Sequence, residues 1–177
     1  MQERRPFTSI EARRESGKGK STLMRFLRSP QAVVALVAVL VIAIDQVTKT
    51  LAETHLANHS VKIFGPLSFK LLYNTGVAFS IGAGNTLVVT VIELLVIVGI
   101  ILYVRRIKRV ALGVGFGMVI GGALGNIADR LFRHNNGAVI DFIHTGFWPT
   151  FNLADSAVVI GIVVILFASR SKRQQTL

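Results

Sequence analysis

Four long apolar segments constrain the fold of this 177-residue chain more than any other feature of its sequence. They cover about residues 32–51, 86–104, 111–130 and 153–169, and a helix needs about 20 apolar residues to cross a bilayer. We therefore expect an all-α membrane protein with four transmembrane helices, built as one domain over residues 30–170. A cleaved signal peptide is an alternative for the first segment, but no small-residue cleavage site follows it.

The distribution of positive charge predicts how the helices are oriented. Fifteen of the 20 Lys and Arg residues lie within 1–28, 105–109 and 170–173, next to the ends of apolar segments. Such residues gather on the cytoplasmic side of membrane proteins. We therefore expect both tails, 1–29 and 171–177, in the cytoplasm, the first of them disordered. A net charge of +11 can also indicate nucleic-acid binding, but this distribution favours a membrane protein and no nucleic-acid partner.

The two remaining loops, 52–85 and 130–152, are then expected outside the cytoplasm. In the first loop, SVKIF and LSFKLLY are separated by Gly65 and Pro66, which predicts a small extracytoplasmic sheet of two or three short strands. The second loop contains Trp148 and several Phe, residues typical of a membrane interface. We expect the sheet to cradle a bound peptide and the second loop to close over it.

Glycines recur every fourth residue in the third apolar segment, at Gly113, Gly117, Gly121 and Gly125. Residues at this spacing share one helix face, and small side chains there let another helix approach closely. We interpret this ridge as a packing surface for another helix of the same chain, which is expected to be a monomer. Homodimerisation through the ridge is the alternative.

All four aspartates of the chain are expected at the outer ends of helices. Ionisable side chains at membrane depth are costly and often functional, so four at one level suggest a site. Each also has a structural interpretation: Asp45 can pair with Lys49 four residues later, Asp129 with its neighbour, and Asp155 can cap a helix. The four aspartates and their nearest polar neighbours are Asp45, Lys49, Asp129, Arg130, Asp141, Asn152 and Asp155.

Asp141 is the hardest of these to explain structurally, because it lies in the apolar run VIDFI and an unpaired buried carboxylate is costly. Asp155 follows 14 residues later, after Gly146 and Pro149, which is enough chain to fold back. Two adjacent carboxylates share one proton. The charged one can take a proton from water while the protonated one donates to a carbonyl oxygen.

Other chemistry has less support in the sequence. There is no cysteine, and the four histidines are scattered through the outer loops. His55 and His59 are four residues apart, but a third zinc ligand is not evident nearby. No serine lies in a nucleophile motif. We therefore expect no metal and no other cofactor.

Five sequence blocks, in order, resemble the lipoprotein signal peptidases, also called type II signal peptidases. The resemblance covers about residues 32–170, and the blocks are DQVTK at 45–49, NTGVAF at 74–79, GGALGNIADR at 121–130, VIDFI at 139–143 and FNLADSAVVIG at 151–161. It implies an aspartic endopeptidase of the bacterial cytoplasmic membrane that cleaves prolipoproteins before a diacylglyceryl-modified cysteine. It also implies inhibition by globomycin-type cyclic peptides and no metal.

The resemblance implies residue roles as well. Asp141 and Asp155 would form the catalytic dyad, near the outer face of the membrane. The other residues of the five blocks would support the site or bind substrate, and they are Asp45, Lys49, Asn74, Gly76, Ala78, Asn126, Asp129, Arg130 and Asn152.

Two other classes of function have weaker support in the sequence. A small transporter or channel subunit could use Asp45, Glu93 and Asp129 to bind protons or cations, but such carboxylates belong near the bilayer midplane, where only Glu93 is expected. A membrane scaffold packing through the glycine ridge would give no reason for Asp141 and Asp155. The sequence does not identify a partner for Glu93.

Overall fold

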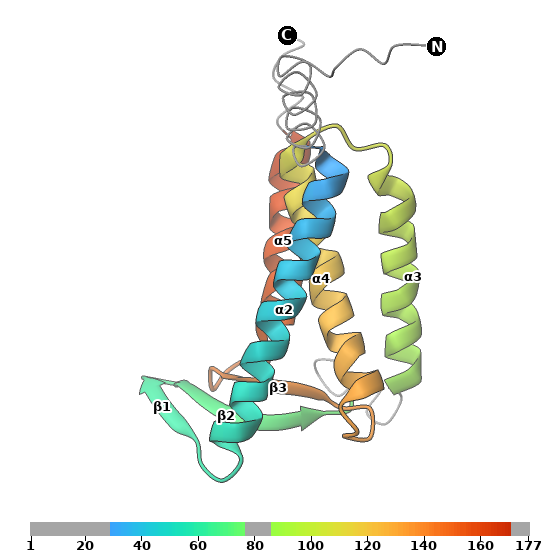
Figure 1. The fold of residues 1–177 in the computed structure, drawn as a ribbon. Coiled ribbons are helices and arrows are strands. Elements are labelled where there is room, and N and C mark those ends of the chain that lie inside the picture. Colours follow the sequence, from blue (N-terminus) through green and yellow to red (C-terminus); the bar gives the residue numbers. More distant parts are fainter. Residues whose placement is uncertain (1–28, 77–85, 171–177) are drawn as a thin grey trace, which may run out of the picture.

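The computed structural model describes residues 29–76 and 86–170. Four long helices dominate this part of the chain, and all four are long and apolar enough to cross a membrane. The prediction of four transmembrane helices with a small sheet is confirmed (Figure 1). The helices are α2 (Pro30–Leu56), α3 (Thr86–Val104), α4 (Val110–Phe132) and α5 (Leu153–Arg170).

Helix α2 begins at a well-formed cap and extends further than its apolar segment. The Ser29 hydroxyl accepts a hydrogen bond from the Ala32 N–H, and Pro30 occupies the first turn, where its missing N–H costs nothing. The helix continues to Leu56, past the membrane-spanning segment expected to end near residue 51, and Ala52 and Leu56 pack against Phe142 of the sheet.

Helix α4 lies at the centre of the bundle and packs against each of the other three helices. Its glycine ridge faces α2 at very short range. A Cβ atom added at Gly117 would lie 2.8 Å from the Val34 carbonyl oxygen, and one at Gly121 would lie 2.8 Å from that of Ala38. The ridge is therefore a packing surface within the chain, as predicted. A second face of α4 meets α5, where a Cβ atom at Gly122 would lie 2.4 Å from the Ala154 carbonyl oxygen.

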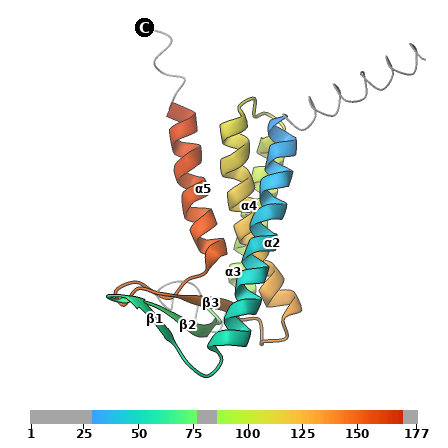
Figure 2. The same ribbon diagram turned by 60° about the vertical axis from the view of Figure 1, so that its left-hand side comes forward.

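Three antiparallel strands, β1 (Val61–Phe64), β2 (Leu67–Asn74) and β3 (Val139–His144), form a sheet in the order β1-β2-β3. Two of them come from the first loop, as predicted, and the third is the VIDFI run. The sheet lies across one end of the helix bundle (Figures 1 and 2). Both β2 and β3 contact α2, β3 also contacts α4, and the first four residues of β3 are buried.

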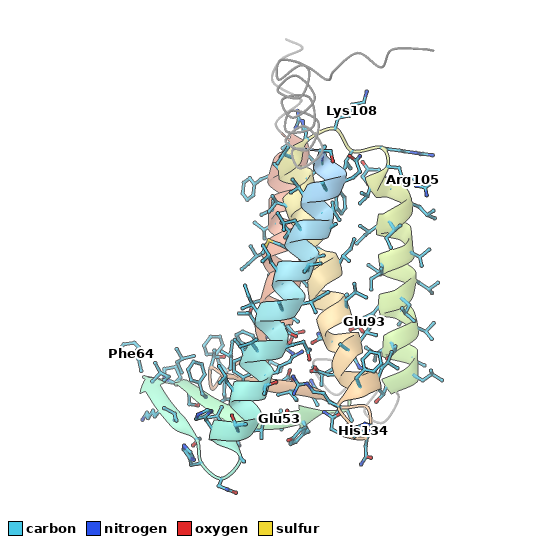
Figure 3. All side chains as sticks on the ribbon, viewed as in Figure 1. Glu53, Phe64, Glu93, Arg105, Lys108 and His134 are labelled. Atoms are coloured by element: carbon cyan, nitrogen blue, oxygen red, sulfur yellow. The ribbon has the colours of Figure 1, made fainter. Side chains whose placement is uncertain are left out.

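The opposite end of the bundle holds the start of α2, the end of α5 and the short α3–α4 connection (Figure 1). The basic residues of 105–109 lie at that end (Figure 3). Between the two ends, α2, α3 and α5 present large exposed apolar side chains, including Leu40, Leu95 and Phe167. Such outward apolar faces suit contact with lipid.

Candidate functional site

Strand β3 carries Asp141 into the interior at the sheet end of the bundle, where the residue is 1% exposed. Two neutral amides bind its carboxylate. Asn74, on the paired strand β2, donates from Nδ2 to Oδ2 at 2.9 Å, and Asn152 donates from Nδ2 to Oδ1 at 2.8 Å. The predicted strand-like run therefore becomes a buried strand, and Asp141 has partners that make its burial tolerable.

The chain folds back between Asp141 and Asp155, as predicted. After β3, Phe151 pairs with Ile143 by backbone hydrogen bonds, and α5 begins two residues later. The Asp155 N–H donates to Asn152 Oδ1 at 2.9 Å, while the Asn152 N–H donates to Asp155 Oδ2 at 3.1 Å. This reciprocal arrangement is a capping box. The structural interpretation of Asp155 as a cap is thus correct, and it accounts for one carboxylate oxygen.

Two asparagines connect the carboxylates of Asp141 and Asp155. Asn126, on α4, donates from Nδ2 to the second Asp155 oxygen, Oδ1, at 2.9 Å. Its own Oδ1 accepts from Asn152 Nδ2 at 3.1 Å, and the same Nδ2 group serves Asp141. A continuous line of neutral amides therefore holds both carboxylates in place.

Both aspartates line one cavity of about 330 Å³. Burial, followed by the negative charge of Asp155, raises the pKa of the Asp141 carboxyl from its ordinary 3.8 to about 7. A carboxyl with a raised pKa, on the same cavity wall as a second carboxylate, suits general acid–base chemistry. The remaining wall residues that matter for the chemistry are Asn74, Gly76, Glu93, Asn126, Arg130 and Trp148.

A second pair of aspartates surrounds the buried amine of Lys49. Lys49 Nζ lies 2.8 Å from Asp45 Oδ2, 2.8 Å from Asp129 Oδ2 and 2.9 Å from Asn126 Oδ1, and all three charged side chains are fully buried. The expected ion pair of Asp45 with Lys49 is therefore present, and Asp129 forms a second ion pair with the same amine. Such a group is tolerated in the interior because its charges are paired and bonded.

This charged cluster also fixes the backbone beside each cavity aspartate. Asp129 Oδ2 accepts the Ile140 N–H at 3.1 Å, one residue before Asp141. Asp45 Oδ1 accepts the Ala154 N–H at 2.9 Å, one residue before Asp155. The cluster therefore ties α2 and α4 to the two segments that carry the cavity carboxylates.

Three contacts at this end were not anticipated from the sequence. Arg130 pairs with Glu93 at 2.7 Å, rather than with its neighbour Asp129. Arg133 lies 3.2 Å from Asp129 and also pairs with Glu53. The contacts between helices depend on how each helix is rotated about its axis, which a local sequence pattern does not show. Only the Asp129–Arg133 contact could have been predicted, because these residues are four apart in one helix.

Two further predicted site residues lie on the segment after β2. The Gly76 N–H donates to Asn74 Oδ1 at 3.0 Å, which orients the amide that binds Asp141, and Gly76 itself lines the cavity. Ala78 lies outside the described residues. Within residues 29–76 and 86–170, no three His, Asp or Glu side chains are grouped as metal ligands would be.

Comparison with known proteins gives consistent similarities. A family model described as signal peptidase (SPase) II matches residues 37–170. The lipoprotein signal peptidase of Mycobacterium leprae (strain Br4923) is 41% identical over 138 residues, which is 75% of this chain and 69% of the relative. That of Mycobacterium avium (strain 104) is 43% identical over 138 residues, which is 75% of this chain and 76% of the relative.

A solved structure is also similar. It is described as a bacterial membrane enzyme structure obtained by the in meso method at 2.3 Å resolution, and the TM-score is 0.70 with 28% identity. The match covers 82% of this chain and 94% of that one. Its agreement extends over almost the whole of the solved chain.

Proposed function

This chain belongs to the signal peptidase II family, and on that premise we propose that it removes signal peptides from prolipoproteins by aspartic catalysis. The scissile bond would lie just before a cysteine that carries a diacylglyceryl group. The observation that carries this proposal is the pair of carboxylates, Asp141 and Asp155, held by neutral amides on the wall of one cavity.

In this proposal Asp141 holds the shared proton and Asp155 is ionised. Asp155 takes a proton from a water molecule, whose oxygen attacks the scissile carbonyl carbon, while Asp141 donates its proton to the carbonyl oxygen. The resulting tetrahedral intermediate collapses when Asp155 returns its proton to the departing amine and Asp141 regains one from a hydroxyl of the intermediate. Both carboxyls end in their starting states.

The surroundings of the cavity suit an apolar substrate. A signal peptide is itself an apolar helix, and the lipidated cysteine would hold the scissile bond at the membrane surface. The cavity is lined by residues of β2 and β3, so it lies at the sheet end of a bundle whose outward faces are apolar. The sheet would cradle the extended peptide, with Asn126 and Arg130 on the cavity wall available to contact its backbone.

The proposed location is the bacterial cytoplasmic membrane, with the sheet end outside and both termini in the cytoplasm. The basic residues at the other end of the bundle support this orientation, because such residues gather on the cytoplasmic side of membrane proteins. We propose that one chain suffices, since α4 finds partner helices within its own chain, and that globomycin-type peptides compete for the cavity.

The direct test is to incubate the purified chain with a prolipoprotein in two forms, one diacylglyceryl-modified and one unmodified. We expect the mature lipoprotein to appear only from the modified form, with the diacylated cysteine as its new N-terminus by mass spectrometry, and globomycin to block its appearance. Equal cleavage of both forms, or a new N-terminus elsewhere, would contradict the proposed specificity.

A further inference from the structure

Glu93 is the only acidic residue of α3, and its position is unusual. It lies seven residues after the start of the helix at Thr86, about 10 Å along the axis at 1.5 Å per residue. An ionisable side chain at that depth is costly and needs a reason. Figure 3 shows Glu93 between α3 and α4.

The face of α3 that carries Glu93 is the face that meets α4. Val89 and Ile97 lie one helical turn before and after it, and both are buried; Ile97 packs against Ala123 and Ile127. Glu93 is thus directed into the bundle, and its Oε2 atom lies 2.7 Å from Arg130 Nη1. The two side chains are 21% and 7% exposed.

This ion pair forms part of the wall of the cavity that holds Asp141 and Asp155. Among the described residues, Glu93 is the only hydrogen-bond partner of the Arg130 side chain. The guanidinium has five N–H donors, so most of them remain for a ligand. The other anions that line the cavity are Asp141 and Asp155, and these are the groups a released Arg130 would turn to.

We propose that Glu93 is a positioning residue for Arg130. It holds the guanidinium on the α3 side of the cavity, away from the two cavity carboxylates and ready to bind a peptide carbonyl. This inference rests on the proposed peptidase function. Without Glu93, Arg130 pairs with a catalytic carboxylate, which then cannot act on water.

The test is a double-mutant cycle measured as kcat and KM for cleavage of the diacylated prolipoprotein. We expect Glu93→Gln, which keeps the size but not the charge, to lower kcat/KM by about ten-fold or more, mainly through kcat. Glu93→Asp, which keeps the charge, should recover part of the loss. In an Arg130→Gln background, adding Glu93→Gln should change kcat/KM by less than about two-fold, because the group it positions is gone.

Thr90→Val is the matched control, since Thr90 lies on the same face of α3 and its hydroxyl bonds only within the helix, to Thr86. It should cleave at the wild-type rate, and thermal unfolding of all variants shows whether each is folded. Wild-type kcat/KM in Glu93→Gln would overturn this inference but leave the proposed function standing. The same holds if adding Glu93→Gln to the Arg130→Gln variant lowers kcat/KM by the full ten-fold, because Glu93 would then act independently of Arg130. A wild-type chain that cleaves no prolipoprotein would overturn both this inference and the proposed function.

Discussion

At the scale of single residues, the four aspartates separate into two pairs by the chemistry of their partners. Asp45 and Asp129 form ion pairs with the Lys49 amine, so a positive charge lies next to each of them. Asp141 and Asp155 bind neutral amides and backbone N–H groups, which hold their oxygens without a direct ion pair. Only the second pair is suited to moving protons, and only that pair lines the cavity.

The raised pKa of Asp141 predicts the pH dependence of cleavage. Burial and the charge of Asp155 raise this pKa to about 7, and the mechanism needs Asp141 protonated. We therefore expect kcat/KM to fall as pH rises through about 7. A profile that stays flat from pH 6 to pH 9 would show that Asp141 does not supply a catalytic proton.

The same shift predicts the pH dependence of folding stability. The folded-state pKa lies above the unfolded value, so the native chain binds more protons than the unfolded chain between about pH 4 and 7. The contribution of the Asp141 carboxyl to the free energy of unfolding is fully present below about pH 4 and is lost as pH rises through about 7. Thermal unfolding of the wild type and Asp141→Asn across this range should show a larger loss in the wild type.

The Lys49 cluster predicts a large stability effect of one substitution. Lys49→Met leaves the fully buried Asp45 without its cation and Asp129 with Arg133 alone, and breaking a buried pair in this way costs about 3–5 kcal/mol. We expect a clearly lower unfolding temperature in detergent. Lys62→Met, at an exposed position on β1, is the matched control, and an equal loss there would refute the assignment.

At the scale of the elements, local sequence patterns predicted what local physics determines. The apolar segments predicted four helices, the glycine ridge predicted close packing, and SVKIF and LSFKLLY predicted strands, all of which the structure contains. The pairing of β3 with β2 was not predicted, because it joins Asp141 to Asn74 across 67 residues of chain. The partners of Glu93 and Arg133 were missed for a similar reason, since helix rotation decides them.

The contact between α4 and α5 predicts an effect of one methyl group. In Gly122→Ala the new Cβ atom would lie 2.4 Å from the Ala154 carbonyl oxygen, and overpacking of this kind costs about 1–3 kcal/mol. Because Ala154 precedes Asp155, we expect both the unfolding temperature and kcat to fall. Gly99→Ala on α3 has nothing within 4 Å of its new Cβ atom and should leave both unchanged; matching losses in the two variants would contradict this account.

At the scale of the whole molecule, polar and apolar parts are separated along the bundle axis. The charged cluster, the amides and the cavity gather at the sheet end, while apolar side chains cover the outward faces between the two ends. Charge counting on the sequence predicts an orientation for this axis, and that orientation stays a prediction. It could not predict that α4 would be the central helix, because that depends on which faces of all four helices meet.

The proposed orientation can be tested because the natural sequence has no cysteine. Single cysteines at Lys62, exposed on β1, and at Lys108, exposed at the basic end, give two probes. In intact cells a membrane-impermeant thiol reagent should label Lys62→Cys and spare Lys108→Cys. In disrupted cells it should label both. The reverse pattern in intact cells would invert the topology and place the cavity at the cytoplasmic face.

The central claim is that Asp141 and Asp155 together cleave the substrate, and the most direct measurement is single-turnover cleavage of a diacylated prolipoprotein by Asp141→Asn and Asp155→Asn. Each variant keeps the shape of the side chain but cannot exchange a proton, so we expect at least about a thousand-fold loss of rate in both, with the fold retained. Glu53→Gln, an acid-to-amide change outside the cavity lining, should cleave within about three-fold of the wild type. Near-wild-type cleavage by either asparagine variant would contradict the claim.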